Sequence, residues 1–225
     1  MNKAWLASAL SALLAFIGGC AAEPITRAPL PLLNNPNPVD VRASFLHEMP
    51  NLRVTFDETV IIRAPFHKEL AVLAELVVDR PADRFELVGL THVGVTLFKI
   101  SGDVHGASVD FAVPQLLEHK NLLLALGLDI RRIYFDLVPN DAASVTLGKT
   151  LIRFSEKTSE GRLVYEFGGE PALLLEKHLD GFFGAIWRVE YFQYESSGEG
   201  LFPREIVMNN NQFHYQIIVK NRAIR

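Results

Sequence analysis

Cys20 is the only cysteine in this 225-residue chain, and it carries the most distinctive chemistry in the sequence. A single thiol cannot form an intrachain disulfide, and it supplies too few ligands for a cysteine-based zinc site. It can still be modified covalently, and the segment before it favours that. Lys3 precedes an uncharged apolar run, 4–17, which ends just before Gly18-Gly19. The run is shorter than the roughly 20 residues of a membrane-spanning helix, and it has the length of the apolar part of a secretory signal peptide.

Residues 17–20 have the sequence Ile-Gly-Gly-Cys, which resembles the lipobox of bacterial lipoproteins, where one apolar and two small residues precede a cysteine. The resemblance implies that 1–19 is a signal peptide, that cleavage falls between Gly19 and Cys20, and that the Cys20 thiol is acylated. Each buried CH₂ of an acyl chain contributes about 0.8 kcal/mol, so two chains anchor a protein stably. The alternative is a plain signal peptide with Cys20 as a free thiol.

The residues after Cys20 predict a location and a tether. Ala21 stands where, by the sorting rule of enteric bacteria, an Asp would hold a lipoprotein in the inner membrane. Its absence predicts the periplasmic face of the outer membrane, with the inner membrane still open. The segment 20–39 contains five prolines, which lack the N–H group that helices and sheets need. It is therefore expected to be an extended lipidated tether before a single domain, 40–225.

The rest of the chain contains no catalytic motif. There is no G-x-S-x-G, H-E-x-x-H, P-loop or G-x-G-x-x-G sequence, and the seven histidines are scattered. Asp57 and Glu58 are adjacent, so on a strand they would point to opposite faces. The net charge of −4 gives no basic excess for nucleic acid. We therefore expect no enzyme, no metal, no cofactor and no nucleic-acid partner.

The domain is predicted to consist of short antiparallel strands interrupted by a helical insert at about 114–140. A short helix is expected over 41–49, with Asp40 as its cap. About six strands follow up to 113, joined by short turns that make neighbours antiparallel. The insert is predicted as two helices, one from Pro114 with Gly127 as its C-cap and one starting at Asp129. Strands resume from 150 to 220.

Several strands are apolar on both faces. Within 185–194, one face is expected to carry Ile186, Phe192 and Tyr194, and the other Trp187, Val189 and Tyr191. In a sheet with one solvent-exposed face, apolar and polar residues should instead alternate along each strand. Two interpretations remain open: an ordinary two-layer core with helices on the sheet, or a sheet face that lines an apolar cavity.

The run 84–99, an alternating strand, an apolar-Gly tip and the next strand, is similar to the corresponding segment of LolB-like outer-membrane lipoproteins. The end of the chain is similar too, with Pro203, a strand, the Asn-rich turn 209–211 and a last strand. The closer likeness is to uncharacterised bacterial lipoproteins, some of which accompany aryl polyene genes. The resemblance implies a mainly β (α+β) fold, in which a curved antiparallel sheet forms an incomplete barrel covered by central helices. It also implies a tip at His92 and Val93 that touches a membrane or a partner, with Val93 in place of the family's leucine. The alternative is a simple hairpin turn without such a contact.

The same resemblance implies an apolar cavity that receives acyl chains. Aromatic residues favour strands for packing alone, so a solid core is the alternative. Arg131 and Arg132 either meet an anionic headgroup at the cavity mouth or lie on a solvated helix face. The candidate cavity residues are those on the predicted strands: Phe85, Leu87, Phe98, Phe111, Tyr165, Phe167, Trp187, Tyr191 and Phe213.

Three functions follow from these expectations. The leading one is a membrane-anchored lipoprotein that binds or transfers an amphiphile, such as an acyl chain, a lipoprotein or another lipid-like ligand, in the cell envelope. The second is a structural or assembly lipoprotein that docks another envelope protein and has no ligand cavity. The third, an enzyme acting on modified lipids, would need a pocket holding a His–carboxylate pair within hydrogen-bond reach.

Overall fold

Twelve antiparallel strands form one sheet in the computed structural model, which describes residues 27, 30–33, 36–49, 52–64, 69–198 and 200–225. The predicted signal peptide, its cleavage after Gly19 and the acylation of Cys20 lie outside the described residues. The strands are β1 (Arg53–Arg63), β2 (Leu70–Asp79), β3 (Arg84–Leu90), β4 (Thr96–Asp103), β5 (Gly106–Ala112), β6 (Ser144–Leu147), β7 (Leu151–Lys157), β8 (Arg162–Gly168), β9 (Leu173–Gly181), β10 (Gly184–Ser197), β11 (Gly200–Asn210) and β12 (Tyr215–Ile224).

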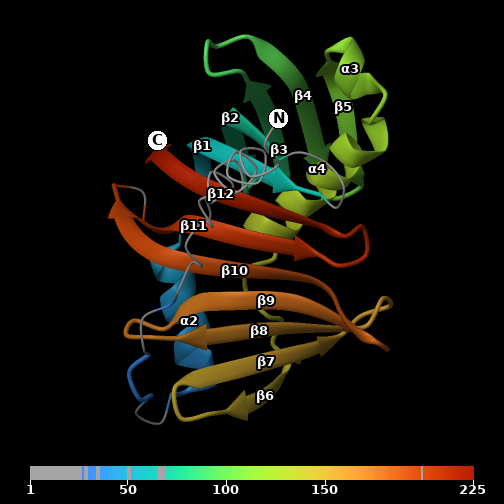
Figure 1. Cartoon of the computed structure of the whole chain (residues 1–225). Coiled ribbons are helices and arrows are strands. Elements are labelled where there is room, and N and C mark those ends of the chain that lie inside the picture. Colours follow the sequence, from blue (N-terminus) through green and yellow to red (C-terminus); the bar gives the residue numbers. More distant parts are fainter. Residues whose placement is uncertain (1–26, 28–29, 34–35, 50–51, 65–68, 199) are drawn as a thin grey trace, which may run out of the picture.

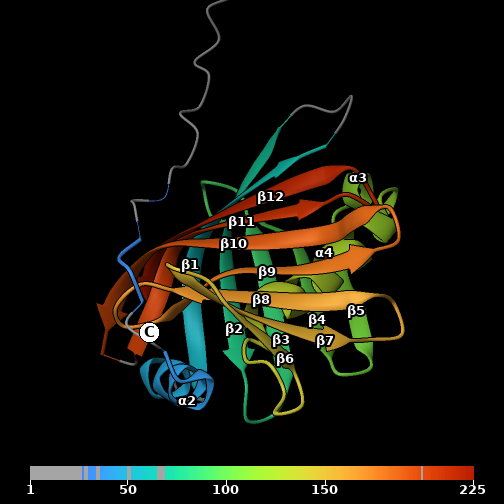
Figure 2. The ribbon, with the colours of Figure 1, turned by 90° about the horizontal axis from the view of Figure 1, so that it is seen from below.

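The order across the sheet is β5-β4-β3-β2-β1-β12-β11-β10-β9-β8-β7-β6, so the two edges are β5 and β6. The first and last strands are therefore central neighbours, paired from Phe56↔Ile224 to Arg63↔Gln216. The sheet curves strongly without closing into a barrel, and its two arms face each other across α4 (Lys120–Tyr134) (Figures 1 and 2). The predicted fold class, an incomplete antiparallel barrel with helices on it, is confirmed.

Alternation along the first strand explains which face of the sheet is buried. Val54, Phe56, Val60 and Ile62 are buried in the core, as their period-two spacing predicts. Glu58 lies in the same inward row and is 2% exposed, whereas Asp57 on the outer face pairs with Arg225. The first half of the chain has five strands rather than the expected six or so, because the polar pair 57–58 does not interrupt β1.

The helices differ from the prediction at their ends. α2 (Pro38–Glu48) begins after Asn37, whose side chain accepts a hydrogen bond of 3.1 Å from the Val39 N–H, so Asp40 is not the cap. α3 (Pro114–Leu117) does begin at Pro114. Gly127 does not end a helix, and Asp129 does not start one, because α4 runs through both.

At Gly127, α4 lies close against β4 and β5. A Cβ atom placed on Gly127 would lie 2.4 Å from Ala107 Cβ and 3.2 Å from Ile100 Cγ2. Glycine therefore serves packing at this position, although it lowers helix propensity by about 1 kcal/mol relative to alanine. No described helix is long and apolar enough to cross a membrane.

The apolar residues of β10 were expected on both faces of the sheet, but most of them belong to one core. The register shifts between Ala185 and Trp187, and Ile186 packs against the main core beneath α4. Tyr194 also packs against that core, after Gln193 adopts a left-handed conformation (φ 52°). Of the three residues expected on the second face, only Phe192 lies there, in a small separate cluster with Val207, Ile218 and Ile61.

Candidate ligand-binding site

Seven of the nine predicted cavity residues come together on the concave side of the sheet. They are almost fully buried in one core cluster and pack against neighbouring side chains. The Phe167 ring, for example, meets the Phe45 ring of α2 edge to face, with centroids 5.2 Å apart. In the structure, these residues form a packed core under α4 and α2: Phe85, Leu87, Phe98, Tyr165, Phe167, Trp187 and Tyr191.

Phe111 and Phe213 were predicted wrongly, since neither side chain lies in the core. Phe111 is 48% exposed on the edge strand β5, where it pairs with the outward-facing Lys99. Phe213 is 53% exposed in the turn between β11 and β12, and its ring stacks on that of Tyr215 at 6.5 Å. Counting every second residue failed at Phe111 because the pairing of β4 with β5 shifts by one residue after Lys99. It failed at Phe213 because β12 begins only at Tyr215, so Phe213 belongs to the turn before it.

The predicted tip lies in the turn between β3 and β4. The turn is held by the Thr91 hydroxyl, which accepts a hydrogen bond of 3.0 Å from the Val95 N–H, and by Gly94 at φ 84°. Val93 is 72% exposed, and His92 is exposed beside it. The structure thus places an apolar side chain at the end of an ordered turn.

A pocket of about 470 Å³ opens between α2, the turn after β2 and the segment that follows α4. Its volume falls within the range of roughly 300–1,000 Å³ that is typical of small-molecule sites. The sequence interpretation did not include these positions, because they come from three elements far apart in the chain. They are Phe45, Leu46, Met49, Arg80, Asp83, Tyr134, Phe135, Asp136, Leu137 and Val138.

A buried pair lies at the wall of this pocket. The Tyr134 hydroxyl donates a hydrogen bond of 2.5 Å to Glu58 Oε1. Burial raises the pKa of Glu58 to about 8, and the hydrogen bond from Tyr134 opposes that shift. The carboxyl group is therefore protonated at neutral pH. Burial also raises the pKa of Tyr134 well above its usual value.

A buried lysine, a half-buried arginine and a tyrosine donate hydrogen bonds to carbonyl groups at the C-terminal end of α4. Arg80 Nε donates to the Tyr134 carbonyl oxygen at 3.2 Å, and the Tyr191 hydroxyl donates to the Ile133 carbonyl oxygen at 2.8 Å. Lys177 Nζ donates to the carbonyl oxygens of Phe135 (2.9 Å) and Asp136 (3.1 Å). The carbonyl groups of Ile133 and Tyr134 are among those that a helix leaves without internal partners, those of Phe135 and Asp136 follow directly, and positive charge is favourable there. The sheet thereby fixes the segment that walls the pocket.

Burial lowers the pKa values of both cations. That of Lys177 falls to about 8 and that of Arg80 to about 10, so both remain mostly charged at neutral pH. The Lys177 ammonium also lies 5.9 Å from the Tyr165 ring centre. One signal could have revealed Lys177: it stands two residues before Leu179, in the inward-facing row of β9.

A second polar cluster fixes the middle of α4. The Asp129 carboxylate is fully buried and accepts hydrogen bonds from Arg132 Nη1 (2.7 Å), from Asn210 Nδ2 and from the Tyr215 hydroxyl. Burial raises the pKa of Asp129, and these contacts oppose the shift. The two arginines of α4 thus separate: Arg132 binds inside this cluster, while Arg131 pairs at 2.9 Å with Asp83 at the pocket.

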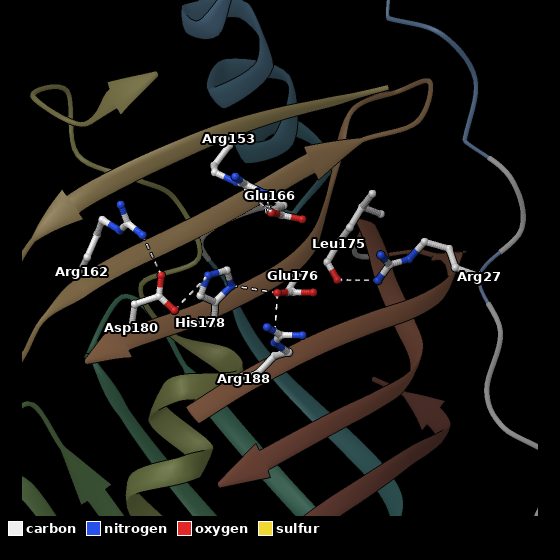
Figure 3. A network of polar contacts seen from close by, with 9 residues as sticks. All are labelled: Arg27, Arg153, Arg162, Glu166, Leu175, Glu176, His178, Asp180 and Arg188. Carbon is white, nitrogen blue, oxygen red and sulfur yellow. Dashed lines mark hydrogen bonds and ion pairs between the residues drawn. The ribbon is translucent and has the colours of Figure 1, made fainter. Parts of the chain in front are cut away.

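The outer face of β8–β10 carries a charged network, shown in Figure 3. His178 Nδ1 lies 2.8 Å from Glu176 Oε1, and His178 Nε2 lies 3.6 Å from Asp180 Oδ1. Each carboxylate also pairs with an arginine: Glu176 with Arg188 at 3.2 Å and Asp180 with Arg162 at 3.0 Å. This His–carboxylate pair is on the opposite side of the sheet from the pocket. Within the described part of the chain, no group of His, Cys, Asp and Glu could hold a metal ion.

Arg27 of the predicted tether binds the sheet at a point where β9 and β10 are no longer paired. The β9–β10 ladder ends at Glu176↔Glu190. Beyond it, Arg27 Nη2 donates to the carbonyl oxygen of Leu175 at 2.7 Å (Figure 3). It also donates to the carbonyl oxygen of Tyr191 at 3.3 Å. The same guanidinium lies 5.1 Å from the centre of the Phe192 ring. The tether is therefore attached to the convex face at Arg27.

Known structures share this architecture. A LolA superfamily protein from Nitrosomonas europaea matches with a TM-score of 0.51 and 9% identity over 82% of this chain and 92% of its own. A structure described as a "putative outer membrane lipoprotein-sorting protein domain" from Vibrio parahaemolyticus matches with a TM-score of 0.54 and 9% identity. The match covers 84% of this chain and 90% of that one. A DUF1329 family protein from Desulfovibrio piger ATCC 29098 matches with a TM-score of 0.51 and 12% identity. The match covers 84% of this chain and 91% of that one. These likenesses establish a LolA-like fold, as the sequence resemblance implied.

Sequence comparison places the chain in a family. No curated protein matches it. A family model described as "Protein of unknown function (DUF3261)" matches residues 67–223, which span β2 to β12. Since that match covers most of the folded domain, the chain belongs to the DUF3261 family.

Proposed function

We propose that this protein is a lipid-anchored lipoprotein of the bacterial cell envelope that binds an amphiphile, whose apolar part enters the pocket beside α2. The observation that carries the proposal is the pocket itself, about 470 Å³, which opens beside the aromatic core. The LolA-like fold supports it, because one structure of that fold is named as a lipoprotein-sorting domain. Ligand binding, rather than catalysis, is the proposed activity.

The apolar wall suits a hydrocarbon chain. Leu46, Met49, Leu137 and Val138 line the pocket, and Phe45 connects it to the core. Burial of apolar surface contributes about 25 cal/mol per Å², so an acyl chain needs no specific polar contacts to bind. This accounts for a binding protein without a recognisable sequence motif.

The polar wall suits an anionic headgroup. Arg80 lines the pocket and stays charged at neutral pH, with its pKa at about 10. Arg131 lies beside it, paired with Asp83. Guanidinium groups bind carboxylate and phosphate in a bidentate manner, so the headgroup of a fatty acid or a phospholipid is proposed to lie at this end. It would have to exchange with contacts that Arg80 already makes to Tyr134 and Met49 and that Arg131 makes to Asp83.

The anchor is proposed to be the acylated Cys20, and the location the periplasmic face of the outer membrane. Cells grown with labelled palmitate should incorporate the label into the wild-type protein. The Cys20→Ser variant should carry no label. A Cys20→Ser variant that still incorporates labelled palmitate would contradict this anchor.

Ligand binding is tested on protein purified without detergent. We expect native mass spectrometry to detect a co-purifying lipid and a fluorescent fatty acid to bind. Met49→Trp should fill the pocket and weaken binding about tenfold or more. Leu128→Gln is the matched control, because Leu128 is 44% exposed on α4 and does not line the pocket.

A second candidate is an assembly lipoprotein that docks an envelope protein and holds no ligand. The tight packing of the inner aromatic residues favours it: the Phe154 and Phe167 rings lie 5.6 Å apart, edge to face. If no lipid co-purifies and no fatty acid binds, this candidate replaces the first.

A further inference from the structure

The turn between β9 and β10 presents two adjacent phenylalanines to solvent. Gly181 and Gly184 form the last pair of the hairpin, and the two residues between them are Phe182 and Phe183. Their exposed fractions are 94% and 99%. The two rings lie 4.9 Å apart, edge to face. Soluble proteins rarely leave such an apolar group uncovered without a binding role.

The formation of the hairpin does not account for these residues. Turns are dominated by Gly, Pro, Asn, Asp and Ser, and none of them requires an aromatic ring. Here Gly184 takes the positive φ, 124°, whereas Phe182 and Phe183 do not, so the backbone of the turn does not depend on the two phenylalanines. A residue that breaks the local preference without packing into the fold points to function.

A third aromatic ring lies in the next turn of the same edge. The β11–β12 turn is joined to the start of β10, because the Asn211 N–H donates to the Ile186 carbonyl oxygen at 3.0 Å. Asn211 Nδ2 also donates to the Ala185 carbonyl oxygen at 2.7 Å. That turn carries Phe213, which is 53% exposed. Figures 1 and 2 both place the two turns at one edge of the molecule.

The size and shape of the tip favour a bilayer as its partner. Two aromatic rings bury about 150–250 Å² each, whereas a stable protein interface buries about 800 Å² on each partner. A bilayer accepts a narrow apolar tip without a complementary surface. The nearest charges are balanced by partners, such as Asp180 with Arg162, so the tip itself should bind by apolar insertion.

The length of the tether brings the tip within reach of the membrane. Arg27 of the tether bonds to Leu175, and Gly181 is six positions further along β9, which is about 20 Å of strand. Cys20 is seven residues before Arg27, at most about 25 Å of extended chain. We propose that Phe182 and Phe183 insert into the bilayer that holds the N-terminal anchor and thereby orient the domain on it. This reach argument rests on the anchor at Cys20, whereas insertion itself does not depend on the ligand pocket.

The test uses Trp fluorescence on phosphatidylcholine vesicles. Residues 20–225 contain every described contact and a single cysteine, so Cys20 can be coupled directly to a maleimide lipid in the vesicle. In the Phe183→Trp variant, lipids brominated on their acyl chains should quench at least about half of the added emission. In Val104→Trp, in the turn between β4 and β5, they should quench little. Unquenched, water-like emission from Trp at position 183 would overturn the proposal.

A second variant separates insertion from folding. Phe182→Ser with Phe183→Asn puts two turn-forming residues in place of the rings, so the domain should fold as before. With Cys20→Ser in both chains, this variant should bind phosphatidylcholine vesicles about tenfold more weakly than the parent. Equal binding would overturn the proposal. Fatty-acid binding in the pocket should be unchanged, so failure of the ligand proposal is distinguished from failure of this one.

Discussion

The ammonium group of Lys177 on β9 donates a hydrogen bond of 2.9 Å to the carbonyl oxygen of Phe135, the residue that caps the C-terminal end of α4. A buried cation from the sheet thus holds one wall of the pocket. Replacement by Met keeps the apolar stem but leaves the carbonyl oxygens of Phe135 and Asp136 without this donor. We expect Lys177→Met to lower the free energy of unfolding by about 1–3 kcal/mol in urea titrations. Lys157→Met, on an exposed position of β7, is the control. An unchanged or higher stability would show that relief from burying the charge outweighs these hydrogen bonds.

Glu58 should make stability depend on pH between about 4.5 and about 8. Its pKa is 4.5 in ordinary surroundings and about 8 in the fold. In this window the folded chain keeps a proton that the unfolded chain has lost, so the free energy of unfolding falls as pH rises. Urea titrations at pH 5 and pH 8 measure the fall, and Glu58→Gln should reduce it. A fall of the same size in that variant would assign the effect to other groups.

Lys177 should make the free energy of unfolding depend on pH in a separate, more alkaline range. Its pKa is about 8 in the fold, against 10.5 in ordinary surroundings. Between these values the unfolded chain holds a proton that the folded chain has released, so the free energy of unfolding rises with pH. Lys177→Met should remove this rise. If the rise persists in the variant, the buried ammonium is not its cause.

Gly127 should not tolerate a methyl group. In Gly127→Ala the new Cβ would meet Ala107 Cβ at 2.4 Å, and we expect a loss of about 1–3 kcal/mol despite the better helix propensity of alanine. The combined change Ala107→Gly and Gly127→Ala should recover much of that loss. Thermal unfolding of the single and double variants measures both effects. If the stability losses of the two single variants simply add in the double variant, the contact between positions 107 and 127 is not the source of the strain.

Val93 tests the role proposed for the β3–β4 turn in contacting a membrane or a partner. Because Val93 is 72% exposed, Val93→Glu should change stability by no more than about 0.5 kcal/mol. It should slow the release of bound fluorescent lipid to acceptor vesicles, whereas Val104→Glu should not. Equal transfer by both variants and the wild type would remove Val93 from the mechanism.

Side-chain alternation predicted much of the fold. The inward rows of β1 and β2 follow directly from Val54 and Phe56 and from Val72, Leu76 and Val78. Two-residue counting does not include irregularities, so it failed where the register shifts, as at Ile186 and near Phe111. It also missed β6, an edge strand of four exposed residues.

The candidate site was less accessible to sequence reasoning than the core. The pocket joins Phe45, Arg80 and Leu137, whose proximity depends on how three segments pack together. Gly127 shows the same limit. Its residue type fits a helix end as well as a close helix–sheet contact, and only the position of Ala107 decides between them. The exposure of Phe182 could have been noticed, since Gly-Phe-Phe-Gly is an unusual turn sequence.

The central pairing of β1 with β12 has a consequence for biogenesis. The strand that completes the middle of the sheet is separated from its neighbour by nearly the whole domain, so the two arms cannot be joined until the last residues are available. Long-range closure of this kind is slow and leaves unpaired strand edges exposed in the meantime. A chain that crosses a membrane before folding would have to be protected from aggregation during that interval. A chain shortened by β12 would retain two separate half-sheets.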